Sequence, residues 1–143
     1  MGTVSKNFSY REFEDSEIAT ENGIINVITT VSVRDSIKAL VDNVLQPLRD
    51  KWGEPMVLNS GYRCPELNKA VKGELTSQHL KGEAADIRCN RPLELAQLAY
   101  DMGLPYDQMI IYPTFVHFSH KLEGEQRGQI LYNKAYRGEK IKL

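Results

Sequence analysis

Two histidines and one aspartate stand out as side chains that could hold a metal ion. His79 and Asp86 lie in the stretch SQHLKGEAADI, where a turn at Lys81 and Gly82 could bring both side chains to one point. Imidazole nitrogens and carboxylate oxygens are zinc ligands, and a catalytic zinc site uses three protein ligands and leaves one position for water. A third ligand is therefore needed from elsewhere in the chain.

The stretch FVHFSH supplies two further histidines, and strand geometry distinguishes them. Side chains alternate between the two faces of a strand, so His117 faces away from the apolar residues on either side of it, whereas His120 shares their face. An apolar face is typical of a core, and His120 falls at the end of the strand. The spacing therefore predicts a metal site of His79, Asp86 and His117, with histidines that serve unrelated structural roles as the alternative.

Helix and strand patterns predict the framework that must position these side chains. Ser9 and Glu12 have capping-box spacing, which predicts a short helix that closes near Gly23. The clearest helix spans 36–53, where apolar residues recur every three or four positions and Pro47 should kink the helix. We also expect helices at 64–73 and 90–103, and strands at 55–61, 84–89, 107–112, 115–120 and 128–135.

The order of these elements predicts the fold class. Helices come first and strands mostly later, which favours an α+β fold with a small, mainly antiparallel sheet and helices packed on it. A chain of 143 residues fits one compact domain, and no repeat or linker divides it. We therefore predict a single domain over residues 1–143, and we expect a monomer.

Charge and composition argue against several classes of protein. The chain has 18 Lys and Arg against 19 Asp and Glu, whereas nucleic-acid binding relies on a basic surface. No segment is apolar enough to predict a transmembrane helix, and the N-terminus shows no signal-peptide pattern. Cys64 and Cys89 match no zinc-ribbon or CxxC spacing, so we expect two free thiols.

Three stretches, SGYRCPELNKAV, SQHLKGEAADI and YDQMIIYPTFVHFSH, resemble in this order the successive blocks of the M15 family of zinc peptidases. That family includes D-alanyl-D-alanine carboxypeptidases and dipeptidases, and phage endolysins that cut L-alanyl-D-glutamate bonds. The middle block, Ser-x-His-x-x-Gly-x-Ala-x-Asp, is complete, and the resemblance covers about residues 7–121. It implies a hedgehog/D-Ala-D-Ala peptidase-like domain in which His79, Asp86 and His117 bind Zn²⁺.

The resemblance also implies an activity and several roles. The reaction would be zinc-dependent hydrolysis of a peptide bond in peptidoglycan stem peptides. Arg63 matches a family arginine that binds the substrate carbonyl or the developing oxyanion, and a surface salt bridge is its alternative. Ser77 and Tyr62 would lie near the substrate; as alternatives, Ser77 caps a turn and Tyr62 packs against the sheet. The protein would be made in the cytoplasm and act on the cell wall after release or export, in a phage, prophage or bacterial setting.

One catalytic role is missing from the third block. Family enzymes place an acidic residue or a histidine shortly before the last zinc ligand as general base, and the five residues before His117 include no good base at neutral pH. Asp107, His120 and Glu83 are the remaining local candidates. Because a general base is missing from this block, a metal-bound cell-wall recognition module that does not hydrolyse its ligand is the alternative function. The same ligand types would also fit an iron(II) oxygenase triad, and a metal-free interaction protein would need no ligand set at all.

Overall fold

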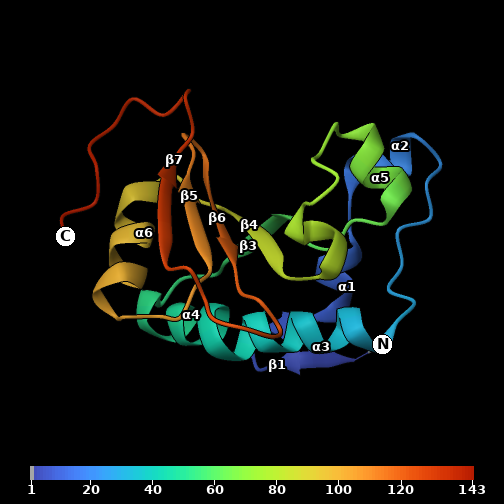
Figure 1. Ribbon diagram of the computed structural model, residues 1–143, viewed down its shortest axis with the longest axis horizontal. Helices are drawn as coiled ribbons and strands as arrows, with labels where there is room; N and C mark the ends of the chain where they lie inside the picture. Colours follow the sequence, from blue (N-terminus) through green and yellow to red (C-terminus); the bar gives the residue numbers. More distant parts are fainter. Residues whose placement is uncertain (1) are drawn as a thin grey trace.

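A five-stranded sheet carries the candidate site in the computed structural model, which describes residues 2–143 (Figure 1). The strand order is β3-β4-β6-β5-β7, and neighbouring strands are antiparallel except for the parallel pair β5 and β7. The strands are β3 (Val57–Ser60), β4 (Ala84–Arg88), β5 (Gln108–Ile111), β6 (Phe115–Ser119) and β7 (Gln129–Tyr132), with a separate hairpin of β1 (Thr3–Ser5) and β2 (Phe8–Ser9). The predicted α+β class with a small, largely antiparallel sheet is confirmed.

Helices cover one face of this sheet and extend beyond its edge. They are α1 (Tyr10–Glu14), α2 (Glu17–Glu21), α3 (Val31–Leu40), the π-helical turn η1 (Val41–Leu45), α4 (Gln46–Trp52), α5 (Pro65–Ala70), the 3₁₀ helix η2 (Gln78–Lys81) and α6 (Pro92–Asp101). Figure 1 shows α3, η1 and α4 as one long helix along the bottom of the view, with α6 beside the sheet and α2 and α5 at the opposite end. No helix within residues 2–143 combines the length and the apolar character needed to cross a bilayer.

The hydrophobic core lies between the long helix, α6 and one face of the sheet. Alternate strand residues are fully buried on that face, among them Ile87 on β4, Met109 on β5 and Phe118 on β6. Leu45 of the long helix and Leu95 of α6 are equally buried in the same cluster. Because this face is occupied by apolar packing, the polar residues that alternate with it emerge on the opposite face, where the candidate site lies.

Two helix predictions needed correction. The helix expected from Ser9 to Gly23 begins with the predicted capping box, but it stops at Glu14 and a second helix starts at Glu17. The extended backbone of Asp15 breaks the first helix, and the Ser16 side chain caps the second by accepting a hydrogen bond from the Ala19 backbone.

The long helix begins earlier than the apolar periodicity suggested. Thr30 caps it by accepting from the backbone N–H of Val33, so the helix starts at Val31 rather than at Ser36. Pro47 has no N–H to donate, and the hydrogen-bonding pattern widens into the π-helical turn η1 just before it. The expected disturbance at the proline therefore takes the form of a π turn within a helix that continues to Trp52.

Candidate metal centre and cleft

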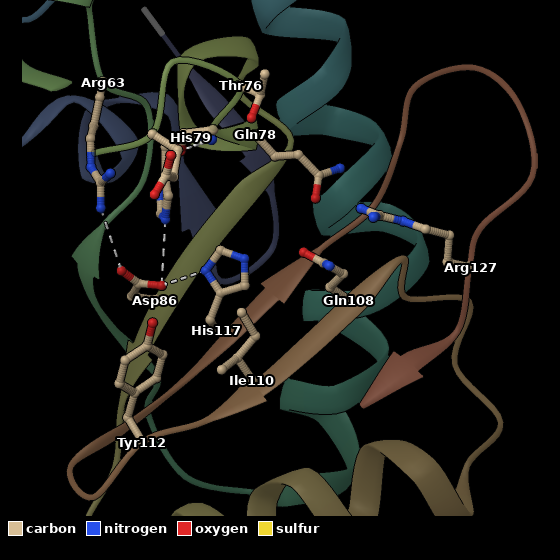
Figure 2. Close-up of a pocket in the computed structure, with 12 residues that line it drawn as sticks. Arg63, Thr76, Gln78, His79, Asp86, Gln108, Ile110, Tyr112, His117 and Arg127 are labelled. Atoms are coloured by element: carbon tan, nitrogen blue, oxygen red, sulfur yellow. Dashed lines mark hydrogen bonds and ion pairs between the residues drawn. The ribbon is translucent and has the colours of Figure 1, made fainter. Parts of the chain in front are cut away.

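An open cleft of about 490 Å³ lies on the sheet face opposite the core. Its lining includes Arg63 and Tyr112 toward one end and Gln108 and Arg127 toward the other, with His117 between them (Figure 2). The cleft thus joins the end of β3, the middle of the sheet and the loop that follows β6.

The sheet register brings two of the predicted metal ligands together. Asp86 on β4 and His117 on β6 are direct cross-strand partners, and Ser60 of β3 is the neighbour of Asp86 on its other side. Side chains of directly opposed residues lie on the same face of an antiparallel pair. The pairing skips Asn59, an irregularity in β3 next to the site that is typical of a β-bulge.

His79 reaches the same point from η2, just before β4. Its ring Nδ1 lies 2.6 Å from the carbonyl oxygen of Gly61, and its own carbonyl accepts from the backbone N–H of Arg63 at 3.0 Å. Because a carbonyl can only accept, Nδ1 carries the proton and Nε2 presents its lone pair to Asp86. Gly82 then ends η2 with a left-handed φ of 76°, and a Cβ there would lie 2.8 Å from the carbonyl oxygen of Val33. This tight turn fulfils the expectation of a fold-back between His79 and Asp86.

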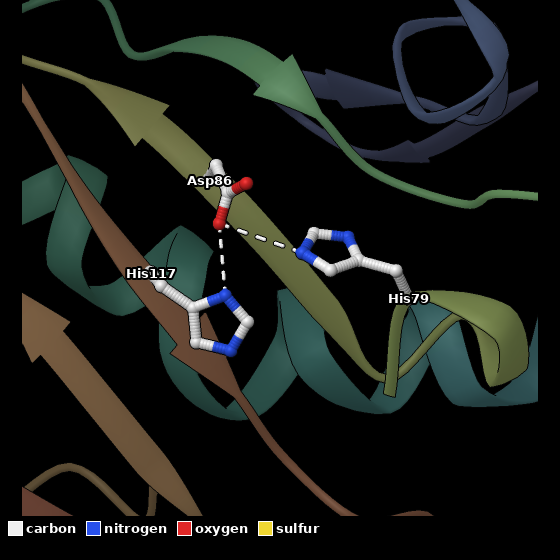
Figure 3. A group of neighbouring side chains, drawn as sticks. All are labelled: His79, Asp86 and His117. Atoms are coloured by element: carbon white, nitrogen blue, oxygen red, sulfur yellow. Dashed lines mark hydrogen bonds and ion pairs between the residues drawn. The ribbon is translucent and has the colours of Figure 1, made fainter. Parts of the chain in front are cut away.

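The three side chains converge closely enough to share one ion (Figure 3). The Asp86 Oδ1 atom lies 2.8 Å from Nδ1 of His117 and 3.5 Å from Nε2 of His79. One candidate ligand atom from each residue lies within 4.8 Å of the other two. The lone pair of His79 and the carboxylate of Asp86 face each other, and a cation shared between them would satisfy both. The cluster therefore fits a metal site in both chemistry and geometry.

Burial and mutual contacts set the protonation of the cluster. Burial alone would raise the pKa of Asp86, but the hydrogen bond with His117 and the nearby imidazole of His79 bring the pKa of this carboxyl well below its usual range. Burial lowers the pKa of His79, and its interactions with Asp86 only partly oppose that effect. Both groups therefore favour the deprotonated form at neutral pH, which is the form that binds a metal ion.

Arg63 is held over one end of the cluster. Its Nε donates to the Ser60 hydroxyl at 3.1 Å, its Nη1 donates to Asn68 Oδ1 at 3.2 Å, and its Nη2 lies 3.9 Å from Asp86 Oδ2. Gly73 makes room for this arrangement, since a Cβ there would lie 2.1 Å from Asn68 Oδ1. Burial lowers the pKa of Arg63, but a guanidinium keeps its charge in proteins. The side chain is thus a fixed cation beside the predicted metal ligands.

The two predicted substrate contacts lie in different surroundings. Ser77 lines the cleft, and its hydroxyl also caps η2 by accepting from the backbone N–H of His79 at 3.2 Å. The Tyr62 side chain is buried in the hydrophobic core, and the residue is not among those that line the cleft within the described chain. This buried position agrees with the alternative in which Tyr62 packs against the sheet, and its contact with a substrate stays a prediction.

None of the three general-base candidates lines the cleft in the described part of the chain. Asp107 is fully buried and forms a bidentate ion pair with Arg127. The His120 ring is hydrogen-bonded to the Pro105 carbonyl oxygen at 2.6 Å. Glu83 accepts hydrogen bonds from the backbone of Leu122 and from the Gln78 side chain. All three side chains are engaged in holding loops or turns in place.

Several residues that line the cleft were absent from the predicted site, and three of them carry ionisable side chains. Glu74 lies in the loop between α5 and η2, Tyr112 lies at the turn between β5 and β6, and Arg127 lies in the loop before β7. Figure 2 shows the Tyr112 hydroxyl pointing toward the Asp86 carboxylate. No local pattern marks Glu74 or Arg127, because only the folded loops bring them to the cleft. Tyr112 could have been identified from its position shortly before His117, the last predicted ligand in the sequence.

The cleft of this α+β fold brings together two imidazoles, a carboxylate and a fixed arginine, a set of groups that could hold a metal ion, as in metal-dependent hydrolases. A family model described as peptidase M15 matches residues 6–119, which is most of the chain. The chain belongs to the peptidase M15 family. It is therefore assigned as a peptidase with a peptide substrate. A comparison with curated proteins finds no match.

Proposed function

We propose that the protein hydrolyses a peptide bond in peptidoglycan stem peptides with a zinc ion held by His79, Asp86 and His117. The observation that carries the proposal is the convergence of these three side chains, from η2, β4 and β6, in one open cleft. Peptidoglycan lies outside the cytoplasm, so the proposed route takes the protein, as a monomer, to the wall by release or export. Membership of a peptidase family supports peptide hydrolysis over an oxygenase reaction.

The donor set suits zinc, which takes imidazole nitrogen and carboxylate oxygen in catalytic sites. The hydrogen bond from His79 to the Gly61 carbonyl is the second contact that fixes a ligating ring in one tautomer. When bound, zinc would lower the pKa of a water molecule toward neutrality and polarise the scissile carbonyl.

Arg63 stabilises the negative charge that develops on the carbonyl oxygen. Its planar cation is already oriented by Ser60 and Asn68, so little rearrangement is needed when the substrate binds. The hydroxyl of Tyr112 lies on the same side of the cleft and can donate a further hydrogen bond to the same oxygen.

Glu74 is the proposed proton acceptor. Asp86 and Glu74 are the two carboxylates that line the cleft within residues 2–143. The Glu74 side chain has no hydrogen-bond or ion-pair partner among these residues. A carboxylate without a fixed partner is available to take a proton from water and to pass it to the leaving amine. Ser77 lies close by in sequence and positions the bound peptide at the cleft wall.

Mass spectrometry of defined muropeptides after incubation with the zinc-supplemented protein tests the proposal. We expect cleavage at one peptide bond, loss of cleavage with a chelator, and recovery when zinc is added back. Intact muropeptides that remain bound to the protein would instead identify a metal-containing recognition module without hydrolysis. Cleavage that persists without metal would contradict the proposed role of zinc.

A further inference from the structure

The loop between β6 and β7 places an arginine with an unusually rigid anchor in the cleft. Nε and Nη2 of Arg127 donate to both carboxylate oxygens of the fully buried Asp107, with distances of 2.7 to 3.2 Å. The Arg127 backbone N–H donates to the same carboxylate at 2.8 Å. Both the side chain and its loop are therefore fixed relative to the sheet.

One edge of this guanidinium remains available to a ligand. Nη1 of Arg127 has no hydrogen-bond partner within residues 2–143, and 47% of the side chain is exposed. Figure 2 shows the side chain reaching toward Gln78 and Gln108, on the side of His117 away from Arg63. The free edge thus lies at the opposite end of the cleft from the proposed oxyanion contact.

The charge around this edge favours an anion. Lys121 Nζ lies 3.8 Å from Asp107 Oδ1, so two cations share one buried carboxylate and leave an excess positive charge. Glu74 and Asp86 line the same cleft and are negative, so the cleft as a whole is not uniformly basic. Selection of an anion would therefore be local to the Arg127 end.

The neighbouring amides complete a pattern suited to a peptide. The Gln78 amide nitrogen donates to Glu83 and the Gln108 amide nitrogen donates to Gln129, which leaves their carbonyl oxygens as acceptors. A bound peptide could donate backbone N–H groups to these oxygens while a carboxylate pairs with Arg127.

We infer that Arg127 forms a carboxylate-binding subsite that selects peptides bearing a free carboxylate near the scissile bond. Its residues lie partly outside the segment matched by the family model, which ends at residue 119. The inference rests on the proposed function for the identity of the ligand as a stem peptide. Such peptides offer two carboxylates: the C-terminal one, and the one left free when D-glutamate is linked through its side chain.

Binding of three synthetic peptides to the metal-free protein tests the subsite without requiring catalysis. The parent is L-Ala-γ-D-Glu-L-Lys-D-Ala; one analogue carries isoglutamine in place of isoglutamate, and the other has a C-terminal amide. We expect one of the two amides to bind about 10- to 100-fold more weakly than the parent, as for loss of a charge-assisted hydrogen bond, in calorimetric or NMR titrations. The sensitive analogue identifies which carboxylate is recognised.

Variants of the anchor assign the discrimination to Arg127. Arg127→Gln should bring the ratio of acid to amide affinity close to one. The double variant Asp107→Asn, Arg127→Gln should do the same without leaving a buried carboxylate unpaired. The matched control is Arg137→Gln, which removes an equal charge from an exposed loop position and should keep the full ratio.

Two results would overturn the subsite: equal affinity of the wild type for all three peptides, or full discrimination in the folded double variant. A parallel measurement of kcat/KM with the zinc-loaded protein separates this inference from the proposed function. Carboxylate preference in binding without any cleavage would leave the subsite standing and remove the hydrolase. Cleavage of acid and amide peptides at equal kcat/KM, with equal affinities, would support the hydrolase and exclude the subsite.

Discussion

Two buried aspartates on neighbouring parts of the sheet show how partners decide the use of a carboxylate. Asp86, on β4, is surrounded by two imidazoles, with the Arg63 guanidinium 3.9 Å away. Asp107, just before β5, is bound by the guanidinium and backbone of Arg127 and lies near the ammonium group of Lys121. Both acids carry a lowered pKa although burial alone would raise it.

The difference lies in what each set of partners can still do. Guanidinium and ammonium groups are donors without a free lone pair, so the Asp107 cluster is a closed ion pair that can hold a loop but cannot bind a metal. Imidazole nitrogens can instead turn lone pairs toward a shared cation, and the Asp86 cluster opens into the cleft. Two buried aspartates therefore differ in use: Asp107 anchors a loop and the Arg127 side chain, whereas Asp86 belongs to the proposed metal site.

Removal of a proposed metal ligand should have the largest effect on zinc binding. His79→Ala and His117→Ala should each weaken zinc binding by more than about 100-fold, a larger loss than is usual for residues that only support a ligand. His120→Ala is the matched control, because its ring contacts the Pro105 carbonyl and should leave zinc binding nearly unchanged. Competition with a colorimetric zinc chelator measures all three. Equal loss in all three variants would remove the proposed ligand set.

A third carboxylate, Glu74, differs from both aspartates because it is exposed and is bound to neither an imidazole nor a cation within the described chain. If it is the proton acceptor, Glu74→Gln should lower kcat by about 10²- to 10⁴-fold while the zinc content stays at one ion per chain. Glu66→Gln, exposed on α5, is the control of equal charge change. Steady-state kinetics with the muropeptide that the wild type cleaves tests this role of Glu74. An unchanged kcat would exclude Glu74 from proton transfer.

The two arginines that line the cleft in the described chain also differ in their hydrogen-bond partners, since Arg127 is bound to the Asp107 carboxylate. Arg63 is oriented by neutral oxygens of Ser60 and Asn68, which leaves its charge available to substrate. Arg63→Lys should retain zinc but lower kcat by about 100-fold, since a single ammonium group cannot reproduce the fork that reaches both neighbours and the oxyanion. Kinetics together with the zinc content of the variant test this. Full activity in the lysine variant would exclude an oxyanion role that depends on the guanidinium geometry.

The sequence could predict the Asp86 cluster but not the Asp107 cluster, for a physical reason. His79, Asp86 and His117 lie on a tight turn and on two strands whose alternation can be inferred locally. Arg127 reaches Asp107 only because the loop after β6 folds back over the sheet, and no periodicity encodes that path. From the sequence alone Asp107 is therefore a candidate base, whereas the structure shows it paired with Arg127.

The fold shows the same division between local and long-range information. Long apolar periodicities and capping residues predicted the main helices and the five strands of the sheet. The break at Ser16 was missed, since one hydroxyl and the extended backbone of Asp15 decide between one helix and two. The hairpin of β1 and β2 was missed as well, because strands of two or three residues carry almost no alternation.

The smallest effect is expected when the closed ion pair is opened. Asp107→Asn replaces charge-assisted hydrogen bonds with neutral ones and should reduce the free energy of unfolding by about 1.5–3 kcal/mol at pH 7. Zinc affinity should stay unchanged, because the Asp107 cluster supplies no proposed ligand. Urea unfolding of both proteins, with zinc titration in parallel, provides the measurement.

The pH dependence of that loss tests whether the charge of Asp107 is its cause. Burial by itself would raise the pKa of Asp107. The contacts with Arg127 lower this pKa by more than burial raises it, so the net pKa lies below the ordinary 3.8. A carboxylate whose pKa is lower in the folded than in the unfolded state stabilises the fold above the unfolded pKa, and this stabilisation is lost as pH falls through the folded pKa. The difference in stability between wild type and Asp107→Asn should therefore be full at neutral pH and shrink steadily below about pH 4. A difference independent of pH would mean that Asp107 holds its loop by shape and neutral hydrogen bonding, and the contrast with Asp86 would then rest on geometry rather than on charge.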